Sequence, residues 1–261
     1  MLLTIDAGNT NTVFALIEGS RIVERWRIST RDQRTYEEYM VWLSQLMDFH
    51  GHKASDIEGA IVATVVPPVE FPLTRLCKKF FKVDPLVVGR LGCDLGVSIE
   101  IDNPREVGAD RLVNAVAGDG LYGGPVIIVD FGTATTFDVV GEGGAYLGGV
   151  ICPGINLSLH ALHQAAAKLP HIAVEAPMTG RVTGKNTLDA MQSGVFWGYV
   201  GLIEGIVTRL KKEHSEDMKV IATGGLATIF GPHTDLIDTV SSDLTLQGLR
   251  MIFERNQKSS I

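Results

Sequence analysis

Cysteine is scarce in this sequence, and long apolar runs are missing. Cys77, Cys93 and Cys152 lie far apart, and none belongs to a Cys-x-x-Cys pair. The sequence therefore predicts neither a disulfide framework nor a thiolate metal site. The apolar run at 59–66 is short and ends at a Pro-Pro pair, and the first residues form no basic, cleavable leader. We expect a cytoplasmic protein without an export signal or a membrane span.

Basic residues are also few. The chain has 23 Lys and Arg against 30 Asp and Glu, which gives a formal net charge of -7. No run of Lys and Arg alternates with aromatic residues, so the electrostatic footprint of a nucleic-acid-binding protein is missing. Hydrophobic residues make up 45% of the 261 residues, which is enough for one large core or for two halves that share a cleft. The composition indicates a globular protein that does not bind nucleic acid.

Apolar residues recur with the periods of strands and of helices in turn. Short apolar runs predict strands, and spacings of three and four between Tyr36 and Met47 predict one apolar face of a helix. The expected elements are strands at 2–5, 13–17 and 21–28, a helix at 36–47, a strand at 60–66, a helix at 72–81 and a strand at 86–88. This alternation is typical of α/β domains.

The opening pattern returns near the middle of the chain. The first strand runs into Asp-Ala-Gly-Asn-Thr-Asn-Thr from Asp6, and the apolar run 126–129 leads into Asp-Phe-Gly-Thr-Ala-Thr-Thr from Asp130. A second strand follows each loop. The repeat predicts a duplicated fold with halves at 1–118 and 119–261. No linker separates these halves, so we expect them to be packed together rather than tethered.

Both loops are suited to phosphate. Gly8 and Gly132 let the backbone approach a ligand closely, while main-chain amides and the Asn and Thr side chains donate hydrogen bonds. A carboxylate such as Asp6 would repel phosphate unless a cation lies between them, and Mg²⁺ bound to ATP phosphates is the natural candidate. Asp130 could hold a second cation. The alternative is that both aspartates are ordinary turn residues; two facing copies favour clamps on a nucleotide.

A third polar segment spans 103–111. The residues 103–106 (Asn-Pro-Arg-Glu) predict a helix start, and Gly108 predicts a break at which backbone amides point at a ligand. Asp110 and Arg111 follow directly. In the functional interpretation Asp110 accepts a proton from a substrate hydroxyl while Arg111 holds an anionic group. In the alternative, both side chains are exposed on a solvated helix.

Taken in order, these motifs resemble those of the type III pantothenate kinases. The similarity extends to Gly148-Gly149, Pro153-Gly154, the segment 184–187 and the segment 223–225, so it covers nearly the whole chain. It implies an α/β, duplicated ribonuclease H-like fold of the actin-like ATPase class, with two lobes around a nucleotide cleft. It also implies ATP-dependent phosphorylation of the 4'-hydroxyl of pantothenate, the first step of coenzyme A biosynthesis. A homodimer is implied as well, in which the partner subunit helps to complete the pantothenate site.

The resemblance assigns a role to each matching residue. The ATP-phosphate segment comprises Asp6, Ala7, Gly8, Asn9, Thr10, Asn11, Thr12 and Val13, with Asp6 reaching Mg²⁺ through the phosphates, and Thr133 is a further ATP contact. The pantothenate contacts are Gly108, Ala109, Asp110, Arg111 and Thr187, and Asp110 is the proton acceptor. Asp130 is the ligand of a monovalent cation, K⁺ or NH₄⁺. One residue departs from the pattern: Ile101 stands where the family often has Tyr, so we expect a phenol contact to the substrate to be absent.

Four glycines lie on one face of an expected helix at 187–210. Gly194, Gly198, Gly201 and Gly205 are spaced four, three and four apart. Each lowers helix stability by up to about 1 kcal/mol relative to Ala, which indicates that another backbone approaches closely. That backbone belongs either to the same subunit or to a second copy, and the resemblance favours the second copy.

Two other functions fit the same residues. One is a kinase of another small hydroxylated acid or sugar, because a fold does not determine its substrate. The other is a nucleotide-sensing regulator that has lost turnover. Intact Asp6, Asp110 and Asp130 argue against the regulator, as does the lack of a basic extension for DNA.

Overall fold

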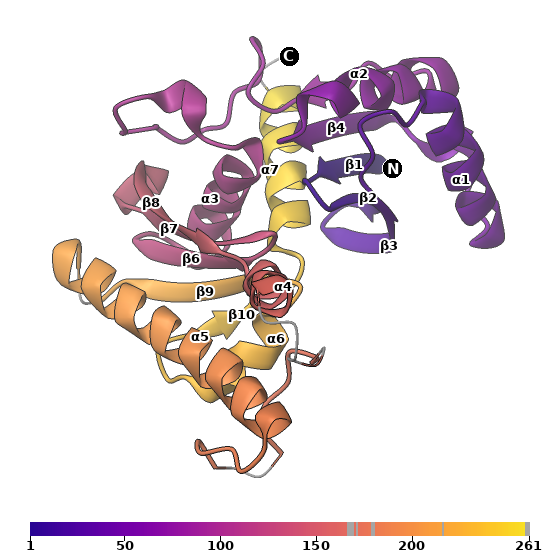
Figure 1. Ribbon diagram of the computed structural model, residues 1–261. Helices are drawn as coiled ribbons and strands as arrows, with labels where there is room; N and C mark the ends of the chain where they lie inside the picture. The colour runs from indigo at the N-terminus through magenta and orange to yellow at the C-terminus, as the bar shows by residue number, and fades with distance from the viewer. Residues whose placement is uncertain (166–169, 171, 179–180, 216, 259–261) are drawn as a thin grey trace. The chain divides into compact units, whose positions relative to one another are not determined.

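The computed structural model describes residues 1–165, 170, 172–178, 181–215 and 217–258 (Figure 1). The chain forms two compact units. The first consists of Met1–Ser98, Asp102–Gly120 and Asp243–Ile261, and the second of Ile99–Ile101 and Leu121–Ser242. Each unit contains one five-stranded sheet. In the part of the chain that is described, no helix combines the length and apolar character needed to cross a membrane.

The sheet of the first unit has the strand order β3-β2-β1-β4-β5. Its strands are β1 (Leu2–Ala7), β2 (Asn11–Glu18), β3 (Arg21–Ser29), β4 (Gly59–Thr64) and β5 (Leu86–Val87). The first three are antiparallel neighbours, while β4 runs parallel to β1 and β5 parallel to β4. The strands expected from the apolar runs are therefore confirmed.

Helices cover both faces of this sheet. On one face, Ile5 and Phe14 are fully buried in a core that they share with α1 (Tyr36–Phe49) and α2 (Pro67–Leu76). On the other face, Ile61 packs in a cluster with side chains of α3 (Ala109–Tyr122) and α7 (Leu244–Lys258). Burial on both faces explains why β4 reads as a continuous apolar run.

The sheet of the second unit repeats this plan. Its order is β8-β7-β6-β9-β10, with β6 (Val126–Phe131), β7 (Ala134–Val140), β8 (Tyr146–Pro153), β9 (Lys219–Gly224) and β10 (Thr239–Val240). The antiparallel and parallel pairings match those of the first sheet, strand for strand. Its core is closed by α4 (Ile155–Ala165), α5 (Thr187–Glu213) and α6 (Ala227–Phe230). The duplicated fold is confirmed by this shared order.

The two hairpin loops differ in length by one residue. Ala7 pairs with Thr12, which leaves residues 8–11 as the first loop. Phe131 pairs with Thr135, which leaves residues 132–134 as the second loop. By register Thr12 corresponds to Thr135, so the two seven-residue motifs do not align position by position beyond the glycine. The repeated Thr residues conceal this one-residue difference in the sequence.

Two helix boundaries differ from expectation. The helix expected at 72–81 begins at Pro67, because proline is tolerated at the first helical positions, and its last part, Cys77–Phe81, is π-helical. The helix start expected at Asn103 is wrong: Pro104–Glu106 forms only a 3-10 turn, and the Asn103 side chain caps nothing. The break expected at Gly108 is confirmed, since α3 begins at Ala109.

The C-terminal helix α7 belongs to the first unit. The sequence-based division placed it with residues 119–261, whereas Leu249 and Ile252 of α7 are buried against Val113 of α3 and Ile61 of β4. Gly248 allows this contact, because a Cβ there would lie 2.2 Å from the Val113 carbonyl oxygen. The first unit is thus closed by the last helix of the chain.

Candidate active site

Asp6 lies near the end of β1, where the first loop begins. It is half-buried and pairs with Val13 of β2 and Ala63 of β4. The Gly8 amide donates to the Asn11 carbonyl oxygen at 3.0 Å, which closes the loop. A Cβ added to Gly8 would meet nothing closer than this oxygen, at 3.4 Å, and Gly8 does not have a left-handed backbone. Neither the packing nor the backbone conformation therefore requires glycine at position 8. A glycine at such a position suits a ligand that approaches the backbone closely.

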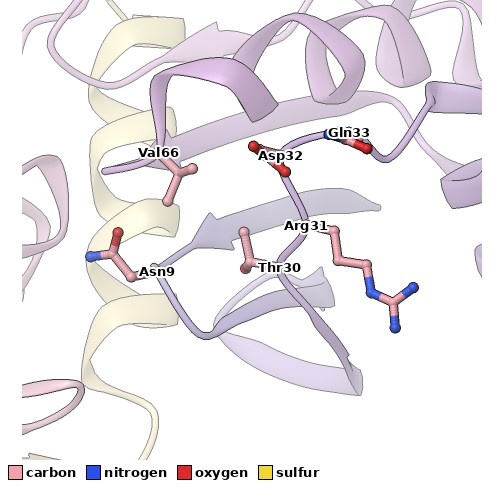
Figure 2. Close-up of a pocket in the computed structure, with 6 residues that line it drawn as sticks. All are labelled: Asn9, Thr30, Arg31, Asp32, Gln33 and Val66. Atoms are coloured by element: carbon pink, nitrogen blue, oxygen red, sulfur yellow. The ribbon is translucent and has the colours of Figure 1, made fainter.

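A pocket of about 520 Å³ adjoins the first loop. Its lining residues come from the loop, from the segment after β3 and from the start of α2 (Figure 2): Asn9, Thr30, Arg31, Asp32, Gln33 and Val66. Thr30 lies between Asn9 and Arg31 in this view, and the Arg31 side chain is directed away from Asn9. Of the lining residues, Asn9, Thr30, Gln33 and Val66 are uncharged, whereas Arg31 and Asp32 are charged.

The segment 108–111 lies beside the same end of β1. The Val65 amide donates to the Ala7 carbonyl oxygen at 3.2 Å, and a Cβ on Gly108 would be 3.3 Å from Val65 Cγ1. The Gly108 carbonyl oxygen accepts the Arg111 amide at 3.1 Å and so opens α3. The first unit thus brings together two of the three motifs singled out in the sequence.

Asp110 is held close to the backbone of this segment. Its Oδ1 accepts the Arg111 amide at 2.8 Å, and a Cβ on Gly108 would lie 2.6 Å from the same oxygen. Burial raises the pKa of the Asp110 carboxyl above its ordinary value, while the amide and charge of Arg111 act in the opposite direction. A raised pKa makes the carboxylate a stronger base than an exposed aspartate.

Asp130 occupies in the second unit the place that Asp6 has in the first. It is half-buried and pairs with Thr136 of β7 and Thr223 of β9. Gly224 packs directly on it: a Cβ there would lie 2.5 Å from Asp130 Oδ1, and the φ of Gly224 is +90°. The sequence singled out the segment 223–225 only through the family resemblance, so the contact between Gly224 and the carboxylate was not predicted.

Thr133 is an exposed residue of the second loop. Gly154, the residue after β8, touches the backbone of this loop, since a Cβ on Gly154 would lie 2.1 Å from the Thr133 carbonyl oxygen. The glycines of Pro153-Gly154 and of 223–225 therefore support the second loop and the aspartate before it.

Thr187 is the first residue of α5. Asn186 caps this helix, because its side-chain oxygen accepts the Asp189 amide at 2.9 Å. A pocket of about 520 Å³ opens at this helix start, lined by Gly184, Lys185, Asn186, Thr187, Ala190 and Met191. Ile101, also in the second unit, is half-buried, with its Cγ2 3.7 Å from the Cβ position of Gly148.

Comparison with known proteins identifies close relatives. The family model described as type III pantothenate kinase matches residues 2–209. A type III pantothenate kinase from Paramagnetospirillum magneticum is 57% identical over 256 residues, which are 98% of this chain and 98% of the relative.

Solved structures resemble the chain in fold at much lower identity. A Baf family transcriptional activator from Campylobacter jejuni has a TM-score of 0.61 at 19% identity, covering 98% of this chain and 99% of that one. The activator of 2-hydroxyisocaproyl-CoA dehydratase from Clostridium difficile has a TM-score of 0.57 at 12% identity, with 99% and 96% covered. These similarities establish the actin-like ATPase fold.

Proposed function

The chain belongs to the type III pantothenate kinase family and phosphorylates pantothenate with ATP in coenzyme A biosynthesis, and from this premise we propose which residues carry out the transfer. The assignment rests on one observation above the others: the glycine-containing loop after Asp6 and the half-buried Asp110 lie at one end of the first sheet. Phosphoryl transfer depends on positioning and on neutralising charge, and this pair supplies the positioning.

In this proposal the segment Asp6–Val13 holds the phosphates of ATP. Gly8 has room for a ligand atom where another residue would have a Cβ. The loop also contains amide and hydroxyl donors, from Asn9, Thr10 and Asn11, that can bond phosphate oxygens. Mg²⁺ bound to ATP neutralises phosphate charge, and the Asp6 carboxylate suits it because hard cations prefer oxygen ligands.

Asp110 orients the 4'-hydroxyl of pantothenate and accepts its proton. As the hydroxyl oxygen bonds to the γ-phosphorus and the bond to ADP breaks, the hydroxyl proton passes to the Asp110 carboxylate. The hydrogen bond from the Arg111 amide fixes one carboxylate oxygen, which leaves the other available for the substrate. We assign pantothenate contacts to Gly108, Ala109 and Arg111 as well, and to Thr187.

The second unit contributes a monovalent-cation ligand. The Asp130 carboxylate is half-buried and packed against Gly224, an anionic oxygen donor of the kind that K⁺ or NH₄⁺ requires. Thr133 contacts ATP in the same proposal. The expected result is activity in K⁺ or NH₄⁺ that falls sharply when Na⁺ replaces them at constant ionic strength.

The active form is a homodimer joined through α5. The buried side chains of α5 face its own core, whereas among the described residues of the second unit no atom lies within 4 Å of a Cβ position at Gly194, Gly198 or Gly201. Packing against the described part of the second unit therefore does not account for these three glycines. A second α5 can approach this bare backbone closely, and Thr187 on the same helix then reaches the partner's substrate.

Sedimentation of a Gly198→Glu variant tests the dimer. Replacing a helical glycine favours the helix by up to about 1 kcal/mol, so we expect a folded protein that sediments as a monomer and has lost activity. A dimeric, fully active variant would contradict the interface.

Three free cysteines, Cys77, Cys93 and Cys152, support a cytoplasmic location.

Substrate choice is tested by competition. With purified protein, Mg²⁺-ATP and K⁺, we expect 4'-phosphopantothenate to form, and small hydroxylated acids or sugars in tenfold excess to leave its rate unchanged. Efficient phosphorylation of a competitor would favour the other kinase assignment. Binding of ATP with no turnover of any acceptor would favour the nucleotide-sensing regulator.

A further inference from the structure

Thr30 connects the segment after β3 to the first loop through three hydrogen bonds. Its amide donates to the Thr10 carbonyl oxygen at 3.0 Å. Its hydroxyl donates to the Gly8 carbonyl oxygen at 2.7 Å and lies 2.9 Å from the hydroxyl of Thr12. Thr30 is half-buried and Thr12 is fully buried. The loop is therefore fixed from outside at two of its carbonyl groups.

The direction of these hydrogen bonds follows from the number of protons. A hydroxyl has one proton and two acceptor sites. Because the Thr30 proton goes to the Gly8 carbonyl, the Thr12 hydroxyl must donate to Thr30. The result is a chain from Thr12 to Thr30 to Gly8, in which each bond polarises the next.

This chain sets the direction of a loop amide. A trans peptide places the N–H of a residue opposite to the preceding carbonyl. With the Gly8 carbonyl held toward Thr30, the Asn9 amide must point in the opposite direction, away from Thr30. Asn9 and Thr30 both line the pocket beside the loop. Thr30 thus determines where a phosphate-binding donor points, without contacting the phosphate itself.

The second unit lacks this device. In the hairpin register, Thr135 takes the place of Thr12, and Gly154 takes the place of Thr30. Gly154 has no side chain to donate or accept a hydrogen bond, and the Thr135 hydroxyl is buried without a hydrogen-bond partner among the described residues. The second loop is instead packed directly against Gly154. The hydroxyl chain is therefore specific to the longer first loop and is not a general requirement of this hairpin.

We propose that Thr30 is a positioning residue for ATP, whose hydroxyl orients the first loop for phosphate binding. This inference rests on the proposed role of the segment Asp6–Val13 in holding ATP. Thr30 lies outside every motif of the sequence. In this proposal its hydroxyl affects the binding of ATP and does not affect the binding of pantothenate.

The test compares Thr30→Val with Thr30→Ser in the full-length protein. Valine keeps the shape and the backbone amide but removes the hydroxyl, and serine keeps the hydroxyl. We expect Thr30→Val to raise the Kd of Mg²⁺-ATP by calorimetry, and its KM, by about 5- to 30-fold, the equivalent of the one or two hydrogen bonds lost. The KM of pantothenate should stay within twofold of wild type. Thr30→Ser should restore ATP binding to within about threefold.

Two further variants separate positioning from folding. Thr74→Val removes a hydroxyl that donates to the Phe71 carbonyl oxygen at 3.0 Å within α2, and it should leave ATP binding unchanged. The double variant Thr12→Val, Thr30→Val also removes the buried Thr12 hydroxyl, which Thr30→Val alone would leave without its partner. It should therefore melt closer to wild type than Thr30→Val while still binding ATP weakly. If ATP affinity recovered together with the melting temperature, Thr30 would be a structural residue only and the proposal would fail.

Asp6→Asn distinguishes this inference from the proposed function. If Asp6→Asn weakens ATP binding and folded Thr30→Val does not, the positioning role of Thr30 is refuted and the loop keeps its function. If neither variant affects ATP binding, the assignment of the whole segment to ATP is refuted, and the inference with it.

Discussion

Replacing Gly224 with alanine should perturb the Asp130 site directly. An alanine there would have its Cβ 2.5 Å from Asp130 Oδ1 and 2.7 Å from both the nitrogen and the oxygen of Phe131. The φ of +90° is also unfavourable for any residue with a Cβ. The methyl group cannot fit unless the carboxylate and the end of β6 both move.

The expected cost follows from these two effects. A non-glycine residue in such a backbone conformation costs about 1–3 kcal/mol, and overfilling a packed site adds about 1–3 kcal/mol. Gly224→Ala should therefore lower the free energy of unfolding by at least about 2 kcal/mol. At about 2–4 °C for each kcal/mol in a chain near this size, the melting temperature should fall by at least about 4 °C.

The functional readout is activation by K⁺. Displacing a group that orients a metal ligand typically weakens metal affinity by about 10- to 100-fold. We expect the K⁺ concentration for half-maximal activity of Gly224→Ala to rise by this factor. Gly225→Ala is the matched control, because its Cβ would meet no atom within 4 Å, and it should behave as wild type.

Gly248→Ala controls for lost stability alone. Its Cβ would lie 2.2 Å from the Val113 carbonyl oxygen in the first unit, so it should melt early and keep the wild-type K⁺ dependence. A Gly224→Ala protein with unchanged K⁺ activation would refute the assignment of Asp130 to the cation. An unchanged melting temperature would refute the packing argument itself.

Three other predictions concern single residues. Because burial raises the pKa of Asp110, the acid limb of the pH profile of kcat/KM should have its midpoint above the ordinary carboxyl pKa of about 3.9. The contribution of the Asp110 carboxyl to the free energy of unfolding is greatest at low pH and falls as the pH rises through its folded-state pKa. Asp110→Asn should therefore melt no lower than wild type at pH 7. Tyr146→Phe removes a hydroxyl that donates to the fully buried Asp138 at 2.8 Å, and urea unfolding should show a loss of about 1–3 kcal/mol; a loss below about 0.5 kcal/mol would contradict a stabilising role for this hydrogen bond. Gly8→Ala should fold normally, since its Cβ has room, but should bind ATP at least about tenfold more weakly if a phosphate occupies that space; wild-type ATP affinity would contradict this use of the space.

Local features of the fold could be predicted from the sequence. Strands ending in Asp6 and Asp130 follow from short apolar runs bounded by turn residues, and the similar loops predicted the shared strand order of the two sheets. The break at Gly108 was also visible, because glycine so soon after a helix signal is unfavourable within the helix.

Features that depend on distant contacts could not be predicted. The position of α7 in the first unit is decided by packing of Leu249 and Ile252 over a long sequence separation. The one-residue difference between the loops is visible only in the strand register. Thr30 belongs to no motif, and its role follows from hydrogen bonds to Gly8 of the first loop and to Thr12 of β2.

The kinetics of Asp110→Asn test the central claim most directly. Purified wild-type and variant proteins are compared in Mg²⁺-ATP, K⁺ and pantothenate, with the binding of both substrates measured by calorimetry. Loss of a positioned proton acceptor should reduce kcat by about 10²- to 10⁴-fold, while both dissociation constants stay within about threefold and the melting temperature does not fall. A variant that keeps a kcat within tenfold of wild type would contradict the assignment of Asp110 as the proton acceptor.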